Sequence, residues 1–138
     1  IRFEDTKGKI YAETSGGDIN AADFNGALEV STSGGDIKLD GDNANIDAST
    51  SGGNVELRYS GENKGISLST SGGDIDVYLP SDFSAAAYLS SSGGDVSCEL
   101  SSNNVQTITS SKFEADINNG GKELVAKTSG GSINVKKK

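Results

Sequence analysis

The sequence contains no histidine, one cysteine and few aromatic residues, and its 20 acidic residues outnumber its 12 basic ones. Without histidine, the chain cannot form an imidazole metal site or an imidazole switch that titrates near neutral pH. A single cysteine excludes an internal disulfide. The net charge of −8 argues against a nucleic-acid partner, because phosphate binding needs clustered lysine and arginine. No apolar run is long enough to span a membrane.

Large aliphatic residues are scarce as well. Leucine, isoleucine, valine and phenylalanine together make up 29 of the 138 residues, which is close to the level at which disorder is expected. The length predicts one domain, residues 1–138. What favours a folded chain is the regular placement of these few apolar residues.

One six-residue phrase recurs along the chain, first as residues 14–19, Thr-Ser-Gly-Gly-Asp-Ile. The steps between the first glycines of successive copies are 18, 18, 20, 21 and 37 residues. Because the last step is double, we interpret residues 110–115, Ser-Ser-Lys-Phe-Glu-Ala, as a degenerate seventh copy. The first glycines of the other six copies are Gly16, Gly34, Gly52, Gly72, Gly93 and Gly130.

Apolar residues alternate with polar ones on both sides of each glycine pair. In the third copy the apolar positions are Ile46 and Ala48 before the pair, and Val55 and Leu57 after it. This period of two predicts two short strands per copy, each with one buried face. The glycine pair is expected to form the corner between them, because glycine reaches positive φ without steric cost. A Gly-Gly hairpin, which would give antiparallel strands, is the alternative.

Stacking the copies in register places like residues on like. The sequence therefore predicts an all-β fold, a single-stranded parallel β-helix (β-solenoid) of about seven right-handed turns of 18–21 residues. Copies should stack in chain order, which puts Ala115 and Ile117 between Val96 and Ile133 of the neighbouring turns. The rest of each turn is rich in Asn, Asp, Gly and Ser and reads as loop. These predicted loops are residues 25–26, 41–43, 60–63 and 118–121.

The two ends of the chain fit the same pattern. Counting the period backwards places Ile1 and Phe3 on buried positions of a second strand. We therefore expect the domain to be truncated at its N-terminal end. Residues 136–138, Lys-Lys-Lys, put charge where an open end of the coil would otherwise pair with other strands.

Hydroxyl groups form columns beside the corner. The residues two positions before the first glycine should point inward and bond to the backbone or to one another, a structural role. The serines one and three positions before it should point outward, which suits either a solvated sheet or a face that binds glycan or ice. The inward column comprises Thr14, Thr32, Thr50, Thr70, Ser91, Ser110 and Thr128.

An acidic column follows the corner. Stacked carboxylates repel one another, so each needs a partner, and capping of backbone N–H groups in the turn is the favoured explanation. Calcium binding and a catalytic carboxylate pair of the polysaccharide-cleaving type are the alternatives. The column comprises Asp18, Asp36, Asn54, Asp74, Asp95 and Glu114.

Two further positions depart from the repeat. Cys98 occupies an inward aliphatic position, so we expect a buried small hydrophobe and not a nucleophile. Lys112 and Phe113 replace a glycine pair, so this corner must differ from the others. Phe113 is expected to fold over its neighbour in preference to forming an external contact.

The recurrent phrase Ser-Gly-Gly-Asp-Ile followed by alternating apolar residues resembles a bacterial family of adhesin domains. The resemblance covers nearly the whole chain and implies a β-solenoid that is extracellular or located in the cell envelope, in the periplasm or on the outer surface. It transfers no catalytic residue, cofactor or metal ligand. We therefore expect a non-enzymatic binding module for a glycan or a protein at the cell surface. A structural polymer that associates end to end and, less favoured, a glycan-cleaving β-helix enzyme are the alternatives.

Overall fold

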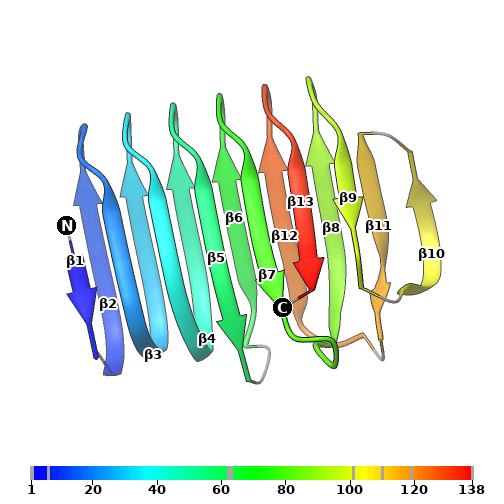
Figure 1. The fold of residues 1–138 in the computed structure, drawn as a ribbon, viewed down its shortest axis with the longest axis horizontal. Coiled ribbons are helices and arrows are strands. Elements are labelled where there is room, and N and C mark those ends of the chain that lie inside the picture. The colour runs from blue at the N-terminus through cyan, green and yellow to red at the C-terminus, as the bar shows by residue number, and fades with distance from the viewer. Residues whose placement is uncertain are drawn as a thin grey trace.

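The computed structural model describes residues 2–5, 7–61, 64–100, 102–109, 111–118 and 120–137. Within these ranges the chain forms strands and turns, and no helix long and apolar enough to cross a membrane is present. The strands stand side by side as a row of narrow loops, with β1 and β2 at one end and β10 at the other (Figure 1). Their bounds are β1 Arg2–Glu4, β2 Lys7–Thr14, β3 Ile19–Thr32, β4 Ile37–Thr50, β5 Val55–Ser60, β6 Ile66–Thr70, β7 Ile75–Leu79, β8 Ala85–Ser91, β9 Val96–Cys98, β10 Ser102–Ile108, β11 Lys112–Ile117, β12 Glu123–Thr128 and β13 Ile133–Lys137.

Each glycine-containing copy is a pair of strands joined at its corner. We call the strands before the corner layer A (β2, the second halves of β3 and β4, β6, β12 and β8). Those after the corner form layer B (β1, the first halves of β3 and β4, β5, β7, β13 and β9). Within each layer neighbouring strands are parallel and in register, so that Leu28 lies between Ile10 and Ile46. The predicted all-β fold with like residues stacked on like is therefore confirmed.

The last copy does not stack in chain order. Strand β12 pairs with β6 on one side and β8 on the other, and β13 lies between β7 and β9. In Figure 1 the orange and red strands β12 and β13 accordingly stand between the green and yellow-green pairs. The predicted stacking in chain order is wrong here. Because every corner presents the same backbone groups, the β8–β9 and β12–β13 pairs can each stack on β6–β7.

Residues 110–115 do not form a seventh turn of the same kind, so this prediction is wrong. Lys112–Ile117 is strand β11, which pairs antiparallel with β8 and with β10. Ala115 lies opposite Ala87, and Ile117 lies opposite Ala85. The sheet is therefore mixed, with six glycine-cornered copies and an antiparallel hairpin at one end. The absence of a glycine pair from residues 112–113 explains the difference, because stacked corners need glycine, as shown below.

At the end of the copy opposite the glycine corner, β3 and β4 bend without interrupting the strand. Residues 25–26 and 41–43 lie within continuous strands β3 and β4, so the loops predicted there are wrong. The chain turns through positive φ at Asp23 and Asn43 (53° and 49°) and at Gly61 (84°). Asn and Asp tolerate this conformation better than other residues with side chains. The other two predicted loops are residues 60–63 and 118–121. Residues 62–63 of the first and residue 119 of the second lie outside the described residues.

Apolar side chains fill the space between the layers. The predicted inward positions are buried, with the exceptions of Val96 and Cys98, which are half-buried because β9 is the last strand of layer B. Phe113 is buried, as expected. Phe3 is half-buried, and Ile1 lies outside the described residues. Three aromatic residues that the repeat did not predict also belong to the core: Phe24, Tyr59 and Phe83.

Tyr59 connects two neighbouring copies through its buried hydroxyl. The hydroxyl donates to the carbonyl oxygen of Ala44 at 2.9 Å and accepts from the amide of Ala44 at 2.8 Å. The ring packs edge-on against Phe83, with centroids 5.6 Å apart. A buried phenol needs such partners, so this contact fixes the bend of β4 against β5.

Candidate binding surface

The threonine column is bound to the backbone on the inside of the corner. The Thr50 hydroxyl donates to the carbonyl oxygen of Gly35 in the adjacent copy at 2.9 Å and accepts from the amide of Gly53 at 3.3 Å. The structural role predicted for this column is confirmed for Thr50 and four further members, but not for Thr14 of the first copy, and Ser110 lies outside the described residues. The hydroxyls that make the same bond to an adjacent glycine carbonyl are those of Thr32, Thr70, Ser91 and Thr128.

Except in the first copy, the second glycine of each corner is required by close stacking, not by its φ angle. Neither Gly52 nor Gly53 has positive φ, so the predicted reason for the glycine pair is wrong. A Cβ atom on Gly53 would lie 2.0 Å from the carbonyl oxygen of Gly35, whereas one on Gly52 would meet nothing nearer than 3.7 Å. The backbones of successive corners touch at this point, which leaves no room for a side chain.

The acidic column caps backbone amides, but across copies and not within its own turn. The Asp36 amide donates to Asp18 Oδ1 at 2.9 Å, and the Asn54 amide donates to Asp36 Oδ1 at 2.8 Å. The intercalated copy continues this ladder with Ser132, whose amide donates to Asp74. Through the described part of the chain, no three acidic or cysteine side chains are grouped so that they could hold a metal ion.

Glu114 does not belong to the acidic column. It lies on β11 beside Tyr88 of β8, because Lys112–Ile117 is a strand and not a corner. Of the two outward columns, the one three positions before the first glycine is interrupted: Lys127 stands between Ser69 and Ser90 in the register of layer A. The flat surface of two adjacent hydroxyl columns, which ice binding would need, is therefore broken at Lys127.

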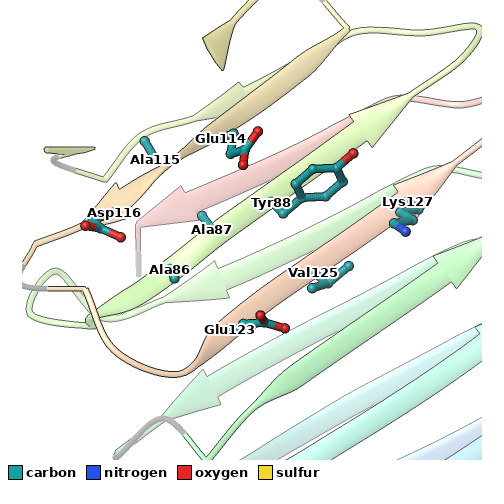
Figure 2. A pocket seen from close by; sticks show the side chains of 9 residues that line it. All are labelled: Ala86, Ala87, Tyr88, Glu114, Ala115, Asp116, Glu123, Val125 and Lys127. Carbon is teal, nitrogen blue, oxygen red and sulfur yellow. The ribbon is translucent and has the colours of Figure 1, made fainter. Parts of the chain in front are cut away.

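A groove crosses the outer face of layer A where β12, β8 and β11 lie side by side (Figure 2). It encloses about 310 Å³. Residues that lie opposite one another on the three strands form rows across the groove. In the first row, Ala86 of β8 lies between Glu123 of β12 and Asp116 of β11. The short side chain of Ala86 leaves the hollow between these two longer ones.

The second row of the groove places Tyr88 between Val125 and Glu114. In the next row along β8, Lys127 and Lys112 lie on either side of Ser90, and of these three residues only Lys127 lines the groove. Along β8, the groove thus passes from carboxylates, through an aromatic and aliphatic section, to the Lys127 ammonium, with the Lys112 ammonium beside it.

Tyr88 stands between two cations. The Lys112 ammonium lies 5.2 Å from the ring centroid and the Lys127 ammonium 5.5 Å from it. Because β11 and β12 flank β8 on opposite sides, the two ammonium groups approach the ring from opposite sides. Cation–π attraction holds the lysines over the ring, which leaves the ring edge and the hydroxyl for a ligand.

The outer face of layer B carries a similar arrangement. Tyr78 lies between Arg58 and Lys136 in the register of β5, β7 and β13, with centroid distances of 5.2 and 5.6 Å.

Tyr11 occupies the repeat position of Tyr88 at the far end of layer A, but its neighbour is acidic. Its hydroxyl donates to Glu13 at 3.1 Å, and this bond and the Glu13 charge raise the pKa of Tyr11.

Sequence reasoning missed the groove because its three strands come from separate parts of the chain and meet only through intercalation. One signal was present. Lys127 breaks the outward serine series at the position that Ser31, Ser49 and Ser69 occupy in earlier copies.

Cys98 is half-buried as a small apolar side chain, and burial raises the pKa of its thiol.

The fold and the groove define an all-β repeat domain with a polar and aromatic surface site. A family described as Toastrack DUF4097 matches residues 8–136, so the chain belongs to this family. No curated protein and no solved structure matches the chain.

Proposed function

We propose that this domain is a non-enzymatic, adhesin-like binding module of the cell surface or periplasm, and that the groove over β8, β11 and β12 holds its ligand. The observation that carries the proposal is the convergence of charged, aromatic and small side chains from three strands around one hollow. Ligand sites commonly combine an apolar floor with a few placed polar groups. We also propose that the six glycine-cornered copies form a right-handed β-solenoid.

A non-enzymatic role fits the carboxylates of the groove. A glycan-cleaving enzyme keeps one carboxylic acid protonated by placing it in an apolar environment. Here Glu114 and Asp116 are half-exposed and Glu123 is exposed, so none of the three has such surroundings. This favours binding over cleavage.

End-to-end polymerisation, the alternative, receives less support from the end of the sheet at which β10 lies. There the hairpin of β10 and β11 reverses the strand direction and contains a register shift between Asn103 and Thr107. Irregular pairing is a device that discourages edge-to-edge association.

Two matched variants test the proposed function. Tyr88→Ser alters the groove, and Tyr78→Ser alters the equivalent tyrosine on the opposite face. We expect wild type and Tyr78→Ser to bind the same features of a glycan array and the same whole cells, and Tyr88→Ser to lose that binding. Equal binding by all three proteins would contradict the proposal, and so would turnover of polysaccharides by the wild type.

A further inference from the structure

The groove presents both signs of charge within a short distance. Its carboxylate row at Ala86 and the row at Ser90, from which Lys127 reaches into the groove, lie four residues apart on β8, which is about 13 Å at the usual rise of a strand. Between them Glu114 lies 4.0 Å from Lys112. A ligand that follows β8 therefore meets carboxylates and ammonium groups in succession.

This charge pattern selects against ions of a single sign. A polyanion along the groove would approach Glu123 and Asp116 as well as the lysines, and a polycation would approach Lys112 and Lys127 as well as the carboxylates. In both cases attraction at one end is offset by repulsion at the other. A hydroxyl group fits both ends, because it donates to a carboxylate and accepts from an ammonium.

The size of the groove favours a small ligand over a folded protein. Its volume of about 310 Å³ lies at the lower end of the range for small-molecule sites. A stable protein interface needs roughly 800 Å² on each partner. The middle of the groove offers Val125, whose methyl groups can pack against the C–H surface of a sugar ring, and the Tyr88 hydroxyl can both donate and accept.

Resting on the proposed binding function, we infer that the ligand is a neutral, hydroxyl-rich glycan chain that lies along β8. Its hydroxyls donate to Glu123 and Asp116 at one end and accept from Lys127 and Lys112 at the other. Ala86 gives the chain room to enter between the two carboxylates. The intercalated strand β12 supplies one wall of the site through Glu123, Val125 and Lys127.

Calorimetric titration tests this inference with cellotetraose, maltotetraose and mannotetraose as neutral probes. Tetragalacturonate and chitosan tetraose serve as anionic and cationic probes. The variant Ala86→Leu fills the hollow without removing a polar group. Its control is Ala27→Leu, which changes another outward, half-buried alanine of layer A. Circular dichroism and the melting temperature show whether each variant is folded.

We expect at least one neutral probe to bind, with an affinity that changes less than threefold between 50 and 500 mM salt. Ala86→Leu should weaken this binding at least tenfold, and Ala27→Leu should leave it unchanged. The inference is overturned if no neutral probe binds, or if a neutral probe binds both variants equally well. Binding of charged probes alone would overturn it too, but would leave the groove as a ligand site if Ala86→Leu abolished that binding. If no saccharide binds, the comparison of Tyr88→Ser with Tyr78→Ser on whole cells still decides the proposed function.

Discussion

The carbonyl oxygen of Gly35 occupies the space that a side chain on Gly53 would need, 2.0 Å from the ideal Cβ position. The same contact recurs at the second glycine of the next copies, where the distance is 2.1 Å for both Gly73 and Gly131. Stacked corners are thus held at a separation that excludes every residue with a Cβ atom.

This contact predicts different effects for two adjacent substitutions. Gly53→Ala should destabilise the domain by about 2 kcal/mol or more, because the backbone of one corner must move. Gly52→Ala should change the free energy of unfolding by less than about 1 kcal/mol, since its Cβ would meet no atom nearer than 3.7 Å, an ordinary van der Waals contact. Chemical denaturation of both variants measures the difference. Equal losses of stability would show that close stacking is not what selects the second glycine.

The threonine column predicts a cost for losing its hydroxyls. Thr50→Val keeps the side-chain shape but leaves the Gly35 carbonyl and the Gly53 amide without this partner, which should cost about 1–3 kcal/mol. Ser49→Ala, one residue away on the outward side, should cost little. A Thr50→Val protein as stable as wild type would contradict the structural role of the column.

The acidic ladder needs an acceptor oxygen and not a negative charge. Asp36→Asn keeps an oxygen for the Asn54 amide, so its free energy of unfolding should remain within about 0.5 kcal/mol of the wild-type value, whereas Asp36→Ala should lower it by about 1 kcal/mol or more in chemical denaturation.

Millimolar calcium should leave the melting temperature unchanged. A ligand at 100 times its dissociation constant would add about 2.7 kcal/mol, so a calcium-dependent rise would revive the metal hypothesis.

Much of the fold could be predicted from the alternation of apolar and polar residues, because alternation determines which side chains face inward. It gave the buried positions of β11 correctly, including Ile117, although it did not give the direction of that strand. A strand has the same alternation whether its neighbour is parallel or antiparallel. The glycine pair likewise predicted a corner. The close contact at Gly53 is made with the neighbouring copy, so the sequence of one copy does not show why glycine is needed there.

The order of the copies and the groove could not be predicted for a related reason. The corners at Gly93 and Gly130 offer the same hydroxyl, amide and carbonyl groups to a neighbour, so local sequence does not distinguish which copy stacks on β6 and β7. The groove depends on that choice, because Lys127 reaches Tyr88 only when β12 lies beside β8.

The half-buried thiol of Cys98 gives a prediction about reactivity. Burial raises the pKa of the thiol above its ordinary value, so the reactive thiolate is scarcer at neutral pH in the folded protein than in the unfolded chain. The rate of reaction with a disulfide reagent should therefore rise on unfolding in denaturant. As pH is raised, the folded protein should reach its half-maximal rate at a higher pH than the unfolded one. Equal pH profiles would contradict the inward placement of Cys98.

The groove is assembled by the intercalation of β12 between β6 and β8, and engineered disulfides can detect this order of strands. With Cys98→Ser as background, Ser69→Cys with Lys127→Cys places two thiols on directly opposed residues of β6 and β12, whose Cα atoms are about 4.8 Å apart. Ser69→Cys with Ser90→Cys places them across an intervening strand, beyond the reach of a disulfide. We expect mild oxidation to cross-link the first pair within one chain and to leave the second pair as free thiols. Cross-linking of the second pair and not the first would show that the copies stack in chain order.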